Sequence, residues 1–193
     1  MTKLEAVNML LRLIGASPVN GLNTELPDAV NAKVTLDRVA RLSQRTGWWF
    51  NVEYNTTLDP VDGKITLTDD ITSIVLNDIN YVARGNRIYN RVLNTYEITE
   101  DLVADRLIRI LDWETSPSIA TDYYAYAAAS DFIRDEIEDS SKQRDLREQA
   151  ATLLMELKAV DLAESRLNMF NTQAARLGRV GRRPYKNIIR GSI

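Results

Sequence analysis

The sequence of 193 residues is 45% hydrophobic and 26% charged with a net charge of −3, which suits one globular domain with room for an inserted subdomain. It contains no cysteine and no histidine, so disulfides, thiol nucleophiles, thiolate zinc sites and histidine-dependent triads are excluded. An enzyme of this composition would depend on paired carboxylates, lysine, tyrosine or a carboxylate-held cation.

An amphipathic helix is predicted at the start of the chain. Thr2 and Glu5 have the spacing of a capping box, and Gly15 followed by Pro18 ends the helix. Its apolar residues recur at helical spacing: Leu4, Val7, Leu11 and Ile14. Polar side chains interrupt this apolar run, so it does not predict a signal peptide, and a product made in the cytoplasm is expected.

A second amphipathic helix is predicted from Pro27 and Asp28 to Gly47. Its apolar face comprises Ala29, Ala32, Leu36 and Val39. Both helices therefore present one apolar face that needs a partner surface.

Short β-prone runs separated by turn residues follow, from Trp48 to Trp113. The runs are WWFNVEY, KITLTDD, INYVARGNRIYN and RLIRILDW. Asp62-Gly63 and Gly85-Asn86 are hairpin signals. These alternating β-prone runs and turns predict a small antiparallel β region.

Helix is predicted to return with Ser116 as N-cap and Pro117 in the first turn. Its apolar face comprises Ile119, Tyr123, Tyr126, Ile133 and Ile137. Among the tyrosines of this helix, Tyr123 and Tyr126 are expected in the core rather than at a subunit contact.

A last helix is predicted from Ser140 or Ser141 for about thirty residues, or roughly 45 Å. Its apolar stripe comprises Leu146, Ala150, Leu153, Leu157, Val160 and Leu167. Such a length exceeds what a compact domain of this size needs, so part of this helix is expected to pack on another subunit.

The predicted fold class is α+β: mainly a helical bundle with an inserted small antiparallel β subdomain and an extended basic C-terminal arm. Residues 1–47 and 114–175 are expected to form the two halves of the bundle, 48–113 the β subdomain and 176–193 the arm.

Four acidic pairs were considered as catalytic groups: Asp59 with Asp62, Asp69 with Asp70, Glu100 with Asp101, and Asp112 with Glu114. All lie in predicted turns or strand ends, where aspartate serves the backbone. No calcium-loop spacing, P-loop or glycine-rich dinucleotide turn is present. The sequence therefore predicts no catalytic residue, metal site or cofactor.

Two motifs of the central region favour protein contacts. Trp48 and Trp49 would point to opposite sides of an extended strand, so one is expected in the core. The other is a candidate for subunit packing, with an ordinary second packing site as the alternative. The hairpin YVARGNRIYN carries the residue types that are enriched at interfaces: Tyr81, Arg84, Arg87 and Tyr89.

The C-terminal segment 176–193 has six basic residues and no acidic one, which leaves 18 basic against 27 acidic residues in 1–175. Phosphate neutralisation is one possible role for it. Because apolar residues interleave with the basic ones, a protein-docking arm is favoured over a DNA-binding tail. The residues expected to dock are Arg179, Arg182, Arg183, Tyr185, Lys186, Ile188, Ile189 and Arg190.

Four blocks of the sequence together resemble the tail tubular protein A family, the head-to-tail adaptors of T7-like podophages. They are AVNMLLRLIGASPV, RTGWWFNVE, INYVARGNRIYNR and LDWETSPS. Each block alone is weak, but their order and spacing over about residues 6–160 are specific in combination.

The resemblance implies a non-enzymatic virion protein of the tail that assembles as a ring of about twelve copies. Its implied partners are the portal protein, the nozzle protein (tail tubular protein B) and the tail fibre protein, with genomic DNA passing through the bore without specific binding, and no membrane. The arm is then expected to dock on the portal or an adjacent copy, and the hairpin on the nozzle, the fibre or a neighbour. The acidic body agrees, because an acidic bore repels DNA phosphates.

Two alternatives from other classes were kept. A DNA-binding protein would use the basic tail on phosphates and bind with steep salt dependence. A carboxylate-based hydrolase of envelope glycan would need two facing carboxyl groups in a cleft.

Overall fold

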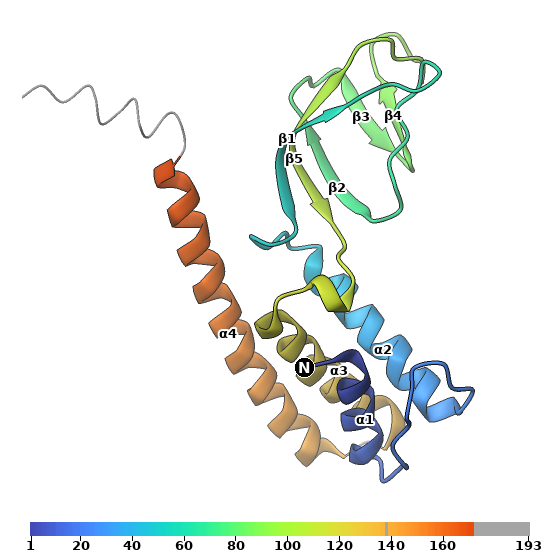
Figure 1. The fold of residues 1–193 in the computed structure, drawn as a ribbon, viewed down its shortest axis with the longest axis vertical. Helices are drawn as coiled ribbons and strands as arrows, with labels where there is room; N and C mark the ends of the chain where they lie inside the picture. The colour runs from blue at the N-terminus through green and yellow to red at the C-terminus, as the bar shows by residue number, and fades with distance from the viewer. Residues whose placement is uncertain (138, 172–193) are drawn as a thin grey trace, which may run out of the picture.

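The computed structural model describes residues 1–137 and 139–171, with side chains through Ser165. Within them, four α-helices gather at one end of the molecule and five strands at the other (Figure 1). The predicted α+β class is confirmed. The segment 176–193, predicted to be an extended arm, lies outside the described residues. No described helix is long and apolar enough to cross a membrane.

Helix α1 (Lys3–Leu13) begins at the predicted capping box. The Glu5 backbone N–H donates to Thr2 Oγ1 (3.2 Å), and the Thr2 N–H donates to the Glu5 carboxylate (2.8 Å). These two bonds lower the pKa of Glu5. Helix α2 (Pro27–Gln44) begins at the predicted proline. Its buried apolar residues are those predicted: Ala29, Ala32, Leu36 and Val39.

Helix α3 (Ser118–Glu136) is the centre of the bundle and contacts the other three helices (Figure 1). Four of its buried residues are alanines, which let the neighbouring helices approach closely: Ala120, Ala125, Ala128 and Ala129. Helix α4 (Ser140–Asn171) begins at the predicted Ser140 and has 32 residues, about 48 Å in length. Its C-terminal end extends beyond the other helices (Figure 1).

Three details predicted for α3 are wrong. The N-cap is Pro117 and not Ser116. Tyr124 is the fully buried tyrosine, while Tyr123 and Tyr126 lie half-buried at the edge of the core. The small alanines mark the buried face, whereas the prediction gave more weight to the larger tyrosines. Ile137 is exposed because α3 ends one residue before it.

The β subdomain contains a three-stranded antiparallel sheet of order β1-β5-β2 and a separate hairpin β3-β4. The strands are β1 (Val52–Leu58), β2 (Ile71–Leu76), β3 (Tyr81–Arg84), β4 (Arg87–Asn90) and β5 (Leu102–Arg109). The predicted turn at Gly85-Asn86 joins β3 to β4. Asp62 and Gly63 form the second predicted tight turn, with φ of 51° and 70° between the paired Val61 and Lys64.

The limits of two predicted strands are wrong. The segment 64–70 (KITLTDD) makes only isolated pairs, and the strand is the next segment, Ile71–Leu76. Residues 48–51 (WWFN) form a turn, so that strand begins at Val52. Turns lie within or beside both segments, and there the backbone is not extended. Residue composition alone does not show where such a turn begins.

Each end of the molecule has its own apolar core. The bundle core is the larger, and its largest buried side chains are Tyr124, Phe132, Leu10, Leu11 and Leu36. The core of the β subdomain consists of Ile65, Leu67, Ile88, Ile98 and Leu102. Partial burial of strand side chains against this small group holds the sheet to the hairpin.

Two buried amide side chains connect the helical bundle to the β subdomain. Gln44 donates to the Leu111 carbonyl (3.0 Å) and accepts from the Leu111 N–H (2.7 Å). Asn51 Nδ2 donates to the carbonyls of Gln44 (2.9 Å) and Arg109 (2.6 Å), and its Oδ1 accepts from the Trp48 N–H (2.8 Å). Buried amides bonded at both ends fix the backbone on either side. We call Gln44, Asn51 and Leu111 the joint.

Candidate interaction surfaces

The acidic side chains of the described residues do not converge on one site. Across residues 1–137 and 139–171, no three acidic side chains gather in a way that could hold a metal ion. Asp70 instead binds Arg109 (2.7 Å), which also binds Glu53 (2.7 Å) and so ties β1 to β5 and to the turn before β2. Hydrogen bonds from Thr68 and Arg109 lower the pKa of Asp70. These carboxylates therefore support the sheet.

The hairpin β3-β4 brings together some of the four residues predicted as contacts. Arg84 lies over the ring of Tyr89, with 3.7 Å between the guanidinium carbon and the ring centroid. Tyr89 in turn meets Tyr96 edge to face, with 4.9 Å between ring centroids. Such stacked pairs are pre-arranged for protein contacts. Tyr96 was not singled out in the sequence, because it lies in the loop after the hairpin.

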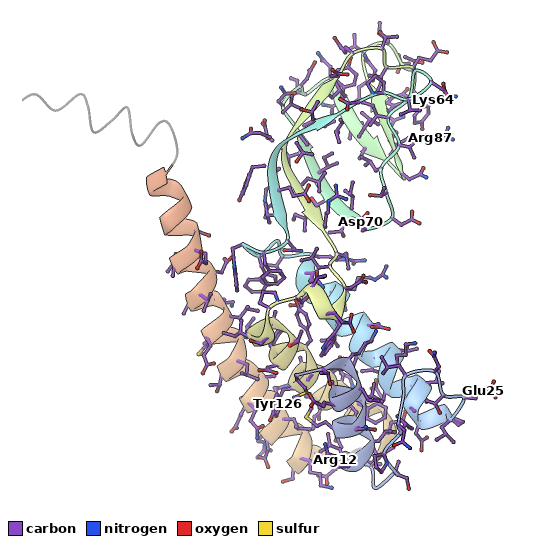
Figure 2. The ribbon with its side chains drawn as sticks, viewed as in Figure 1. Arg12, Glu25, Lys64, Asp70, Arg87 and Tyr126 are labelled. Carbon is purple, nitrogen blue, oxygen red and sulfur yellow. The ribbon has the colours of Figure 1, made fainter. Side chains whose placement is uncertain are left out.

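The other two hairpin residues lie elsewhere. Tyr81 packs against the core of the subdomain and donates to Glu100 (2.5 Å), a bond that raises the pKa of Tyr81. Arg87 is exposed and projects from the same side of the subdomain as Lys64 (Figure 2). The predicted contact set is therefore divided: Arg84 and Arg87 are exposed, whereas Tyr81 and Tyr89 are both half-buried, Tyr81 against the subdomain core and Tyr89 beneath Arg84.

A patch of large aliphatic side chains lies at the open end of the hairpin. We call Ile79, Val92 and Leu93 the tip patch; they are between 64% and 78% exposed. The Arg91 N–H donates to the Asn80 carbonyl (2.8 Å), and the Arg91 guanidinium to the carbonyl of Ile79. The N–H groups of Val92 and Leu93 both donate to Asn90 Oδ1 (2.9 Å). The patch is held in place by the backbone although its side chains contact little.

The tip patch was missed in the sequence. Its residues come from two separate turns on either side of the hairpin, where no periodic pattern can reveal them. The available signal was the presence of isoleucine, valine and leucine in segments that are otherwise turn-forming. Clustered exposed aliphatic residues typically mark protein contacts.

The two tryptophans both reach the bundle core. Trp48 is buried and donates from Nε1 to the Ser43 carbonyl (3.0 Å). Trp49 is partly buried, packs edge to face on Phe50 and has its N–H bonded to Asp161 of α4 (2.8 Å). Trp48 is therefore the core residue of the pair and Trp49 an additional packing residue, and they come from a turn at residues 48–51 rather than from an extended strand. Trp49 keeps an accessible part and stays the candidate for a subunit contact.

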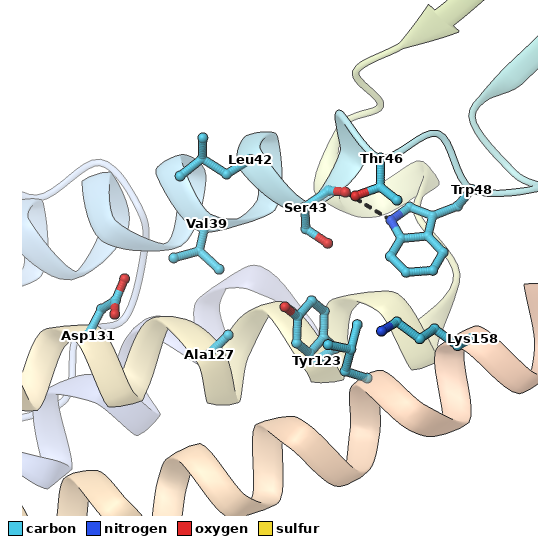
Figure 3. A pocket seen from close by; sticks show the side chains of 10 residues that line it. Val39, Leu42, Ser43, Thr46, Trp48, Tyr123, Ala127, Asp131 and Lys158 are labelled. Atoms are coloured by element: carbon cyan, nitrogen blue, oxygen red, sulfur yellow. Dashed lines mark hydrogen bonds between the residues drawn. The ribbon is translucent and has the colours of Figure 1, made fainter.

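A groove of about 500 Å³ lies between α2 and α4 over α3 (Figure 3). Its floor is apolar and includes Val39, Trp48 and Ala127, and its rim carries Asp131 and Lys158. The groove was not predicted, since three helices distant in sequence form it.

Two hydroxyl groups beside this groove are buried without a hydrogen-bond partner, those of Ser43 and Tyr124. Burial raises the pKa of Tyr124, and the nearby Ser43 hydroxyl offsets that rise by a smaller amount. Burial also raises the pKa of Tyr123 on the groove wall. No arrangement of nucleophile and base accompanies these hydroxyls among the groove-lining residues.

The eight residues predicted to dock the C-terminal arm, from Arg179 to Arg190, lie outside the described residues. What the described part offers is a set of surfaces: an aromatic hairpin, an apolar tip patch and an apolar groove. Surfaces of this kind are suited to contacts with other proteins.

The sequence profile of the family described as Tail tubular protein matches residues 4–178. The chain therefore belongs to the tail tubular protein family and is a structural component of a phage tail in the virion. It is 28% identical over 138 residues to Tail tubular protein A of Klebsiella phage KP34. That similarity covers 70% of this chain and 74% of the relative.

Proposed function

We propose that this tail protein is the head-to-tail adaptor: a ring of about twelve copies between the portal protein and the nozzle protein, with tail fibres held on its outer surface. DNA passes through the bore without specific binding, because the body carries 27 acidic against 18 basic residues and repels phosphates. In this function the chain has three working units: the bundle of 1–47 and 114–175, the β subdomain of 48–113, and the C-terminal segment 176–193.

The observation that carries the proposal is the tip patch. Three aliphatic side chains, each at least 64% exposed, lie together on a subdomain that projects from the bundle (Figure 1). A patch of this kind is costly to leave in water and suits a permanent partner in an assembled tail. We assign the nozzle or fibre contact to the tip patch together with Arg84, Arg87 and Tyr89.

The decisive experiment mixes the purified protein with its portal and examines the product by negative-stain microscopy. Rings seated on the portal are expected, and nozzle protein added next should bind to them. An absence of any complex with the portal would contradict the adaptor function.

The tip patch is tested by Ile79→Ser combined with Leu93→Ser. The pair should weaken nozzle or fibre binding by at least about tenfold, the effect of losing one or two interface hot spots. Stability should change by less than about 0.5 kcal/mol, because both side chains are exposed. Val61→Ser changes another exposed aliphatic residue in a different turn and is the matched control.

For the C-terminal segment we propose docking on the portal or an adjacent copy through its basic and apolar residues. Deleting 178–193 should leave the melting temperature nearly unchanged and abolish co-sedimentation with the portal at moderate salt. A DNA gel-shift of the intact protein runs beside it. If the truncated protein still joins the portal and only the intact one shifts DNA, the segment is a nucleic-acid tail instead.

A further inference from the structure

Helix α2 has an apolar stripe on the side that faces away from its core. Leu26, Val30 and Val34 are between 41% and 60% exposed and recur every four residues. At 100° per residue they lie roughly half a turn from the buried face of the same helix. Such a regular outer stripe is more than the scattered exposure normal for surface residues. We call these three residues the α2 stripe.

Helix α4 has a matching stripe. Met155 and Leu162 are 71% and 53% exposed, and Ala151, one turn before Met155, and Ala159 between the two are exposed on the same side. The opposite side of α4, which packs on α3, is formed by Leu146, Ala150 and Leu157. We call Ala151, Met155, Ala159 and Leu162 the α4 stripe.

The two stripes face away from each other. Both helices pack on α3, and they do so from different sides of it (Figure 1). Each helix turns its buried face toward α3, so the outer stripes point in divergent directions. One copy therefore cannot cover its own stripes, whereas two copies can cover one of each.

We propose that the α2 stripe of one copy packs antiparallel on the α4 stripe of a second copy, an inference that rests on the proposed ring assembly. The contact joins two different surfaces, so it repeats from copy to copy and closes into a ring when the rotation allows. It supplies the neighbouring subunit that the length of α4 requires.

Residue sizes and charges select the antiparallel register. With Val34 opposite Met155, Val30 falls opposite the small Ala159. Arg41, seven residues beyond Val34, then falls opposite Glu148, seven residues before Met155. Arg41 and Glu148 are both exposed, and neither forms an ion pair with any described residue. They are free to pair between copies.

The parallel arrangement is less favourable. With Val30 opposite Met155 and Val34 opposite Ala159, Asp37 would lie against Leu162. A carboxylate facing an apolar side chain at a helix contact loses water without gaining a partner. The antiparallel register avoids this and forms one intermolecular ion pair at the edge of the stripe.

The natural sequence has no cysteine, so engineered cysteines report the contact without interference. Full-length Val34→Cys and Met155→Cys proteins are mixed under oxidising conditions. A mixed dimer is expected, with at least about tenfold less dimer from either protein alone. The double variant should give a ladder of oligomers.

The matched control replaces Met155→Cys with Gln149→Cys. Gln149 is exposed on the same helix but lies roughly 120° around from Met155. Cross-linking of Val34→Cys to Gln149→Cys at an equal level would overturn the assigned surface. So would Val34→Cys dimers formed without the second protein, which would indicate a symmetric α2 contact.

Charge reversal tests the register. Arg41→Glu and Glu148→Arg should each weaken self-association by about tenfold, and the double variant should restore it. Arg147→Glu makes the same change of charge on another side of α4 and should have little effect. If the double variant associates no better than the single ones, the antiparallel register is wrong.

The same samples separate this contact from the adaptor function. Portal-bound rings that form without the cysteine cross-link would overturn the α2–α4 contact and leave the adaptor function intact. Cross-linked ladders that do not bind the portal would support the contact and contradict the function. Monomers in every condition, with portal present, would overturn both.

Discussion

The helical bundle and the β subdomain leave apolar side chains in water in different ways. In the bundle the exposed apolar residues form regular stripes along α2 and α4, which are built on rigid helices. In the β subdomain Tyr54 and Val75 are exposed on strands, but the aliphatic group Ile79, Val92 and Leu93 lies in turns. A stripe suits a repeated helix-to-helix contact between copies of the chain, whereas turns can vary in shape to fit a different partner. One chain thus carries two kinds of protein-binding surface.

The two cores also differ in size. Substitutions in these cores should cause the largest losses of stability. Phe132→Ala should cost about 4 kcal/mol and Ile88→Ala about 3 kcal/mol, because both side chains are fully buried and leave cavities. Urea unfolding with hydrogen exchange is the measurement. Phe132→Ala should reduce protection throughout the bundle, and Ile88→Ala only within 52–109.

The result for Ile88→Ala decides whether the comparison holds. Equal loss of protection in α3 would show that the two cores unfold as one cooperative unit, and the separate treatment of the β subdomain would fail.

Gly47 lies where the chain passes from the bundle to the β subdomain, and close packing there is tested by comparing its substitution with that of Gly85, a glycine of similar backbone conformation. Gly47 has φ of +79°, and an added Cβ would clash with Arg106 and lie 2.8 Å from Ile108 Cδ1. Gly85 has φ of +61° and open space around it. Gly85→Ala should cost about 1 kcal/mol for the left-handed backbone, and Gly47→Ala about 2 to 3 kcal/mol because the clash is added. Thermal unfolding measures both, and equal losses would mean that close packing at Gly47 contributes nothing.

Much of the bundle was predictable because its signals are local. The capping box at Thr2 and Glu5, the proline start of α2 and the start of α4 at Ser140 each depend on a few neighbouring residues. The location of the hairpin turn at Gly85 was predictable for the same reason. Local hydrogen bonds and backbone restrictions act before any tertiary contact forms.

The surfaces were less predictable because they depend on tertiary contacts. Tyr81 is of a residue type that is common at interfaces, yet its ring packs on the core of the β subdomain. In the tip patch, the Arg91 guanidinium donates to the Ile79 carbonyl, and the Leu93 N–H donates to Asn90 Oδ1. Neither arrangement follows from spacing along the chain, since both need the fold of the whole subdomain.

A smaller effect is expected from the ion pairs that tie the sheet. Arg109→Met should cost about 0.5 to 1 kcal/mol at neutral pH, since the pairs with Glu53 and Asp70 are partly exposed. The pKa of Asp70 is lowered in the folded protein, so its stabilisation is present above the ordinary value of 3.8 and is lost as pH falls below it.

The pH dependence checks this assignment. Arg109→Met should flatten the loss of stability of the β subdomain between pH 5 and the acid limit, while the bundle is unaffected. Denaturant unfolding across that pH range is the measurement. If the variant and the natural protein lost stability in parallel, the role assigned to Arg109 would be contradicted.

The smallest effect should come from the bundle and carry the opposite sign. Ser43 has a buried hydroxyl without a hydrogen-bond partner (Figure 3). Ser43→Ala removes it and should leave stability unchanged or raise it by up to about 0.5 kcal/mol. Chemical denaturation is again the measurement, and a loss above 1 kcal/mol would show that the hydroxyl has a water or other partner.

The two strands that connect the β subdomain to the bundle run side by side. Val52 at the start of β1 is paired with Ile108 near the end of β5, so the chain leaves and re-enters the bundle at nearly the same place. An insertion with adjacent ends can be lengthened, shortened or exchanged without separating the segments that it interrupts. Asn51 bonds the chain where it leaves the bundle to the chain where it returns, so these two ends stay together whatever the length of the segment between them.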